Sequence, residues 1–149
     1  MLVISSVDEM RAKGAVIGAQ LRAGDLTLLH GDLGAGKTAL TQGIAQALGI
    51  EGVTSPTFVI SRIHPAGTAG IPLIHVDAYR MQGEAAAIFD DLDLESYLPT
   101  HITVIEWGAG LADRLSDDYL EITLAHGASE NERTLEYVGH GDRWSGFSI

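Results

Sequence analysis

Residues 31–38 have the types and spacing of a phosphate-binding loop. Gly31-Asp-Leu-Gly-Ala-Gly-Lys-Thr38 matches G-x-x-x-x-G-K-[ST] at every defined position. Its glycines let main-chain N–H groups approach phosphate oxygens, Lys37 can reach the terminal phosphates, and the Thr38 hydroxyl can bind Mg²⁺. The predicted chemistry is the binding of a nucleotide with its metal ion. The residues expected to contact the nucleotide here are Gly31, Asp32, Leu33, Gly34, Ala35, Gly36, Lys37, Thr38 and Ala39.

Two acidic residues follow apolar runs typical of buried strands. Asp77 ends the run 71–77, and Glu106 comes directly after Ile-Thr-Val-Ile in the run 101–107. Ligands of open α/β sheets bind beyond the carboxyl ends of the strands, so we expect both carboxylates to converge on the loop. One would bind Mg²⁺ opposite Thr38 and the other would orient or deprotonate an attacking water, and the residues alone leave the two roles open. Lys37, Asp77 and Glu106 are therefore the candidate catalytic residues, and Thr38, Asp77 and Glu106 the candidate metal ligands.

A polar loop at 53–58 lies where many nucleotide hydrolases keep a segment that senses the γ-phosphate. A hydroxyl of Thr54, Ser55 or Thr57 could touch Mg²⁺ or the attacking water there, although the same residues also suit an ordinary Ser/Thr/Pro loop. Trp107 could line the site, but large aromatic residues mostly pack. The histidines lack metal-ligand spacing, and only His75 shares a predicted strand face with Asp77.

The segments that flank the loop predict the strand and helix that such a loop requires. Leu26-Thr-Leu-Leu-His30 is a short apolar run, and residues 37–48 carry apolar side chains at helical spacing. A helix beginning at Lys37 would direct its positive dipole end at the phosphates. The overlapping G-x-G-x-x-A pattern could indicate a dinucleotide site, but Glu51, the acid nearest the required offset, follows a helix rather than a second strand. We therefore prefer a mononucleotide loop.

The other patterns predict a single three-layer α/β domain over residues 1–149. Further strands are expected at 2–4, 57–63, 72–77, 101–107, 119–124 and 133–138. Further helices are expected at 7–22, 84–89, 90–98 and 111–115, the first after the capping box Ser6-Val-Asp-Glu9. Strands 57–63 and 72–77 flank a Gly/Pro turn and should form a hairpin, and the last two strands an antiparallel pair at the far side of the sheet. The expected class is a P-loop NTPase fold with a mostly parallel central sheet and antiparallel strands toward the C-terminus.

Composition and charge restrict the classes of function. The chain has 149 residues, 46% of them hydrophobic, which suits one domain. It has no cysteine, which excludes disulfides and thiolate metal sites, and no apolar stretch approaches the ~20 residues of a membrane span. We expect a soluble cytoplasmic protein. The net charge is −11 and the basic residues are scattered, so tight direct binding to nucleic acid is not expected.

These motifs together resemble those of the TsaE family, P-loop ATPases of bacterial tRNA threonylcarbamoyladenosine (t6A) biosynthesis. The resemblance covers roughly residues 5–138. The segments that carry it, besides the loop, are Thr54-Ser-Pro-Thr-Phe58, His75-Val-Asp-Ala-Tyr-Arg80, Leu92-Asp-Leu-Glu-Ser-Tyr-Leu98 and Ile105-Glu-Trp107. One departure is Gly108-Ala-Gly110, where the family often has proline after the Glu-Trp pair.

The resemblance implies Mg²⁺-dependent ATP hydrolysis, slow without partners. Its partners would be the two related actin-like-fold proteins that form the threonylcarbamoyl-transfer complex, and tRNA would be reached only through them. By the family pattern Thr38 and Glu106 look like Mg²⁺ ligands, and Asp77 like a second acid near the metal or the water. The other implied site residues are the switch-like Thr54 and Thr57, Trp107, and Glu9 and Arg133 near the adenine and ribose.

Three alternative functions can be weighed from the residues. A GTPase is disfavoured because neither Lys13 nor Lys37 is followed two residues later by the Asp of a guanine-binding motif. A small-molecule kinase could use Asp77-Ala-Tyr-Arg80 to hold a phosphoryl acceptor, although the chain has no evident Arg-rich lid. A nucleotide-gated binding module with little turnover is the third.

Overall fold

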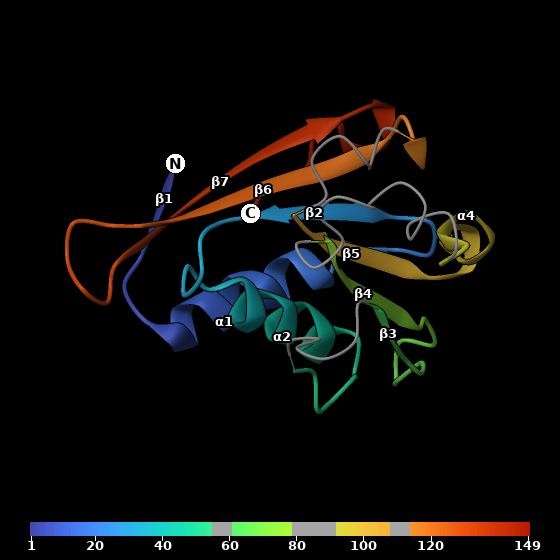
Figure 1. Cartoon of the computed structure of the whole chain (residues 1–149), viewed down its shortest axis with the longest axis horizontal. Helices are drawn as coiled ribbons and strands as arrows, with labels where there is room; N and C mark the ends of the chain where they lie inside the picture. Colours follow the sequence, from blue (N-terminus) through green and yellow to red (C-terminus); the bar gives the residue numbers. More distant parts are fainter. Residues whose placement is uncertain (55–60, 79–91, 108–113) are drawn as a thin grey trace.

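A computed structural model describes residues 1–54, 61–78, 92–107 and 114–149. Within these ranges the strands form one twisted sheet, drawn in Figure 1, with the order β1-β7-β6-β2-β5-β4-β3. The strands are β1 (Leu2–Ile4), β2 (Leu26–His30), β3 (Ser61–His64), β4 (Leu73–Asp77), β5 (Ile102–Glu106), β6 (Tyr119–His126) and β7 (Arg133–His140). The helices are α1 (Val7–Gly18), α2 (Lys37–Ala47) and α4 (Leu94–Tyr97), with the 3-10 helices η2 (Leu98–Thr100) and η4 (Asp142–Trp144).

The centre of the sheet is parallel and its flanks are antiparallel. Strands β4, β5, β2 and β6 lie side by side in parallel pairs. The hairpin partner β3 at one edge, and β7 and β1 at the other, run antiparallel to their neighbours. The predicted fold class is confirmed, as are the hairpin and the antiparallel pair of the last two strands. Burial on both faces explains why β2 and β5 read as nearly continuous apolar runs.

Helices α1 and α2 cover one face of the sheet and lie against each other (Figure 1). A Cβ built on Gly43 of α2 would lie 2.0 Å from the carbonyl oxygen of Arg11, and one on Gly14 of α1 would lie 2.2 Å from that of Leu40. The two backbones therefore touch, and only glycine fits between them. The buried side chains that join this layer to the sheet are Met10, Ile17, Leu40, Ile44, Leu29, Ile102 and Val104.

The opposite face carries a smaller apolar cluster. Leu94 of α4 packs there with residues of β2, β4 and β5, and Leu92 and Leu98 pack against its margin. The buried strand residues of this cluster are Leu26, Leu28, Ile74, Val76 and Ile105. Helical segments on both sides of one sheet give the three-layer arrangement predicted from the sequence.

Helix α1 begins where the capping box predicts and ends sooner than expected. The Ser6 hydroxyl accepts a hydrogen bond from the Glu9 amide at 3.0 Å, and the Glu9 carboxylate accepts one from the Ser5 amide at 2.7 Å. The helix ends at Gly18 instead of continuing to about Arg22. The reason is a turn in which the Asp25 carboxylate accepts a hydrogen bond from the Arg22 amide at 2.8 Å. This turn leads the chain directly into β2.

The C-terminal residues, for which the sequence predicts no role, stabilise the chain at the start of β2. The Arg143 guanidinium donates to both carboxylate oxygens of Asp25, at 2.9 and 2.8 Å, and Asp25 is buried. The Trp144 side chain is also buried, and Phe147 packs against it edge to face. A bidentate pair to a buried carboxylate fixes geometry as well as charge.

Several expected elements fall wholly or partly outside the described residues. These are the helix at 84–89, most of the helix at 111–115, the first residues of the strand at 57–63 and the start of the segment 90–98. The described end of that last segment forms α4 and η2, and Pro99 lies in η2.

The contact between the two helices predicts the effect of a single added methyl group. Alanine normally stabilises an exposed helix position relative to glycine by about 0.5–1 kcal/mol. Gly43→Ala should instead destabilise the fold by about 1–3 kcal/mol, because its Cβ would meet a backbone carbonyl that has no room to move. Urea unfolding measures the change. Gln46→Ala, on the exposed face of the same helix, is the control and should be close to neutral; a stabilised Gly43→Ala would contradict the close contact.

Candidate functional site

The loop between β2 and α2 has a backbone that glycine alone adopts without strain. Gly34 and Gly36 have φ values of +81° and +109°. A Cβ on Gly31 would lie 2.7 Å from the Leu124 carbonyl oxygen, and one on Gly36 would lie 2.8 Å from the Met10 methyl carbon. The N-terminus of α2 follows directly, with Gly36 as its N-cap. The loop is therefore a cradle of bare backbone that packs closely against β6 at Gly31 and against α1 at Gly36.

Lys37 is the positive charge inside this cradle. Its ammonium group donates to the carbonyl oxygen of Gly31 and, at 3.3 Å, to that of Asp32. The same nitrogen lies 4.7 Å from the centre of the Trp107 ring. The lysine is buried, and these contacts of its ammonium group are with the loop itself and with the aromatic face beside it. The amine is held where an anion in the loop would meet it.

The two candidate acids lie on neighbouring strands at the end of the sheet that carries the loop. Asp77 pairs in register with Glu106, and Glu106 pairs with Leu29, the residue next to the end of β2. The Trp107 amide donates to the Leu29 carbonyl oxygen at 3.1 Å, and Trp107 has a φ of +61°. A bulky residue in this left-handed region is strained. The predicted convergence of both acids with the loop strand is therefore observed.

Glu106 is buried and is paired with a histidine. The Nε2 atom of His75 lies 2.6 Å from Oε2 of Glu106, and both side chains are almost fully buried. The sequence analysis placed His75 on a strand face with Asp77 and in a segment that resembles the family, but predicted no partner for it. The pairing explains how a carboxylate is tolerated at the end of a buried strand, because a buried charge needs a hydrogen-bonding partner.

The outer side of the loop is held by the ends of β6 and β7. His126 and Arg133 face each other across these strands, with His126 Nε2 3.3 Å from the Leu33 carbonyl oxygen. The Arg133 Nε group donates to the Gly34 carbonyl oxygen at 3.1 Å. The family resemblance placed Arg133 near the nucleotide. His126 was not predicted to contact the loop, because this contact depends on its position at the end of a strand that pairs with β2.

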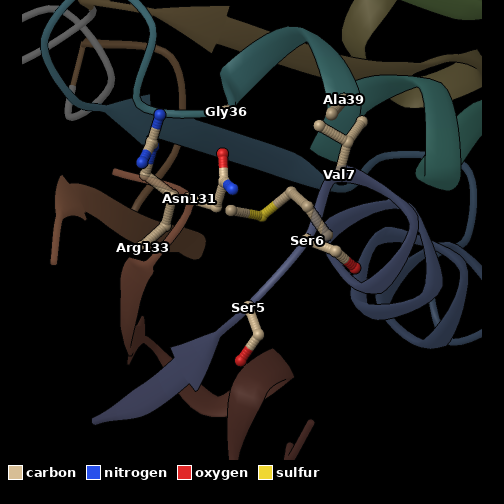
Figure 2. Close-up of a pocket in the computed structure, with 8 residues that line it drawn as sticks. Ser5, Ser6, Val7, Gly36, Ala39, Asn131 and Arg133 are labelled. Carbon is tan, nitrogen blue, oxygen red and sulfur yellow. The ribbon is translucent and has the colours of Figure 1, made fainter. Parts of the chain in front are cut away.

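A pocket adjoins the loop on the side of α1. Its volume is about 280 Å³, and Figure 2 shows the side chains around it. Its lining comes from the start of α1, the start of α2 and the β6–β7 turn: Ser5, Ser6, Val7, Met10, Gly36, Ala39, Asn131 and Arg133. The predicted Glu9 is not in this lining, because its carboxylate caps α1. Gly36 belongs both to this lining and to the loop.

The remaining predicted residues are in different situations. Thr38 lies half-buried in the first turn of α2, and the Leu33 side chain is 94% exposed at the tip of the loop. The Thr54 hydroxyl accepts a hydrogen bond from Arg62 at 3.1 Å, and Thr57 lies outside the described residues.

In the described ranges no three His, Asp or Glu side chains gather as a metal site of their own. Nor does any helix there have the length and hydropathy to cross a membrane.

A sequence profile of the family "Threonylcarbamoyl adenosine biosynthesis protein TsaE" matches residues 4–135. This chain belongs to the TsaE family. Proteins named "tRNA threonylcarbamoyladenosine biosynthesis protein TsaE" are similar to it over most of their length. The one from Streptomyces coelicolor is 44% identical over 140 residues, 91% of this chain and 94% of that protein. The one from Bacillus subtilis is 35% identical over 139 residues, 92% of this chain and 84% of that protein.

A solved structure has the same architecture. The crystal structure of Bacillus subtilis YdiB aligns with a TM-score of 0.77 at 30% sequence identity, covering 97% of this chain and 87% of that one. The TsaE family and this likeness together confirm the P-loop fold expected from the sequence. They also establish a place for the chain in t6A biosynthesis.

A second histidine lies on the same sheet face as His75. His64 of β3 is buried, and its Nε2 atom has no hydrogen-bond partner in the part of the chain that the structure describes. Burial lowers the pKa of His64 below its ordinary value of 6.5, and the neighbouring His75 and Arg62 side chains lower it further.

This lowered pKa predicts how stability depends on pH. Between the pKa of His64 in the folded chain and 6.5, the unfolded chain binds a proton that the folded chain does not, so stability should fall as the pH falls through this window. One proton contributes a slope of at most ~1.4 kcal/mol per pH unit. Urea unfolding of the wild type and of His64→Leu at several pH values measures this contribution, which the variant should lack. His126→Gln removes an exposed histidine as the control; an unchanged slope in His64→Leu would refute the assignment.

Proposed function

We propose that this chain binds ATP with Mg²⁺ and hydrolyses it in support of t6A modification of tRNA. The observation that carries the proposal is the register of β2, β5 and β4. This register sets Glu106 and Asp77 side by side at the carboxyl end of the sheet, beside a complete phosphate loop. Carboxylates at this position can hold a metal ion and orient water against a phosphoryl group.

The loop residues supply the phosphate site. Backbone N–H groups of residues 31–38 and the N-terminal dipole of α2 would bind the phosphate oxygens. The Lys37 ammonium would exchange its contacts with the Gly31 and Asp32 carbonyl oxygens for contacts with the outer phosphates. The close contacts that an added Cβ would make at Gly31 and Gly36 support this, because they show that the loop backbone packs tightly against β6 and α1 and is held in shape.

The adjoining pocket would hold the nucleoside. It opens beside Gly36 and Ala39, the residues on either side of Lys37 and Thr38, so a nucleotide bound in the loop extends naturally into it. Met10 and Val7 offer apolar contact for a base, and Asn131 and Arg133 offer polar groups. Glu9 would act indirectly, by fixing the start of α1.

Three oxygen-bearing side chains suit Mg²⁺. The Thr38 hydroxyl and the Glu106 carboxylate would hold it, and Asp77 would serve as the second acid near the metal or the water. When bound, Mg²⁺ neutralises charge on the phosphate oxygens and orients them. Hard oxygen donors at the mouth of a phosphate loop fit this ion, which keeps several ligands from phosphate and water and does not need a cage of protein side chains.

The partners would be the two actin-like-fold proteins of the threonylcarbamoyl-transfer complex. A net charge of −11 disfavours direct contact with tRNA, so tRNA would be reached through these proteins. Turnover would be slow without them, and we place the chain in the cytoplasm.

Removing the loop amine should weaken nucleotide binding. Lys37→Ala loses charge-assisted hydrogen bonds worth about 1.5–3 kcal/mol, so the Kd for ATP should rise about 10- to 100-fold. Calorimetric titration with Mg-ATP measures it. The only other lysine, Lys13 on α1, provides the matched control, and Lys13→Ala should bind as the wild type does. Equal affinity of the two variants would contradict the role of Lys37.

Removing the acid charge should reduce turnover more than binding. Glu106→Gln should lower kcat for ATP hydrolysis about 100-fold or more and weaken the dependence on Mg²⁺. Phosphate release is measured at steady state with and without the two transfer-complex proteins. Glu95→Gln on α4 is the control. Partner-stimulated release in the wild type supports the proposal, absence of release under every condition supports a binding module, and phosphate transfer to a metabolite supports a kinase.

A further inference from the structure

The hydrogen bond between His75 and Glu106 has a specific place in the sheet. His75 and Glu106 lie on adjacent parallel strands, with His75 opposite Val104 and Glu106 opposite Asp77. Residues two apart on a strand share a face, so the imidazole is diagonal to the Glu106 carboxylate on the side covered by α2. His75 therefore makes its 2.6 Å contact with Glu106 across the strand pair, although it belongs neither to the loop nor to the pair of acids.

The unpartnered nitrogen of His75 defines the direction of this bond. In the described part of the chain the buried Nδ1 atom has no hydrogen-bond partner. An N–H at Nδ1 would be left without an acceptor, so the hydrogen-bond network assigns the proton to Nε2. Nε2 then donates to Oε2 of Glu106, and Oε1 is the oxygen left for a metal ion or a water.

The Glu106 carboxylate needs such a fixed donor because of its neighbour. Asp77 pairs with it in register, and like charges directly opposite each other on two strands repel. A glutamate also has three rotatable bonds, so repulsion would turn the carboxylate away from the position required at the loop. His75 is fully buried and held by packing, so its donor cannot follow such a movement.

We propose that His75 is a positioning residue for the reaction at this site. By donating from Nε2 to Oε2, it holds the Glu106 carboxylate against Asp77 and directs Oε1 toward the phosphate end of the loop. The inference rests on the proposed function of the site. It assigns to His75 a role that neither the loop motif nor the pair of strand-end acids requires.

The test compares two substitutions that keep volume and differ in the donor. His75→Leu removes the N–H, whereas His75→Gln places an amide N–H near the position of Nε2. His75→Leu should lower kcat for ATP hydrolysis about 10- to 100-fold, the usual effect of losing an outer partner of a metal-binding carboxylate. The KM for ATP should change less than about threefold, because the loop and pocket are untouched. His75→Gln should recover most of the lost rate.

His64→Leu is the matched control, because it removes a buried histidine from the same sheet face without touching Glu106. The inference is overturned if His64→Leu loses as much rate as His75→Leu, if His75→Gln is no faster than His75→Leu, or if the loss appears in KM rather than kcat. Urea unfolding of each variant separates loss of rate from loss of fold.

A second measurement keeps the inference independent of turnover. If the wild type releases no phosphate, the proposed hydrolysis fails. The role of His75 is then tested by its effect on Mg²⁺-dependent nucleotide binding. The probe is the ratio of ADP affinities with and without Mg²⁺, measured by calorimetry. This ratio should fall toward one in His75→Leu and stay close to the wild-type ratio in His75→Gln and His64→Leu. An unchanged ratio in His75→Leu overturns the inference.

Discussion

The parallel pairing of β5 between β2 and β4 is the constraint on which the site depends. Register in a parallel sheet fixes which residues end together, and here Leu29, Glu106 and Asp77 form one row across three strands. A slip of one residue would move each acid to the opposite face, away from α2. The buried apolar runs of these strands set the register, so the same residues that form the core also place the carboxylates.

The second constraint is the distance between α1 and α2. Because Gly14 and Gly43 let the helix backbones touch, the start of α1 comes close to the start of α2, and Met10 packs against Gly36. The pocket beside the loop is a consequence of this contact, since its lining is drawn from both helix starts and from the β6–β7 turn. Helix packing and the candidate nucleoside site are therefore one feature of the fold.

The sequence predicted those parts of the structure that local patterns determine. Strand β2, the loop and the start of α2 carry a motif with a fixed geometry, and Asp77 and Glu106 end recognisable apolar runs. The early end of α1 could not be foreseen, because it depends on Asp25 and a turn that Arg143 braces from the far end of the chain. His126 and the partner of His75 were missed for the same reason: they depend on strand order and register, which a single sequence does not reveal.

The attachment of the C-terminal residues to Asp25 bears on how the chain acquires its shape during synthesis. The loop strand β2 emerges from the ribosome early, but its neighbours β5 and β6 and the brace at Arg143 follow some 75 to 120 residues later along the sequence. A chain that ends before β5 therefore presents the loop without the strand that carries Glu106.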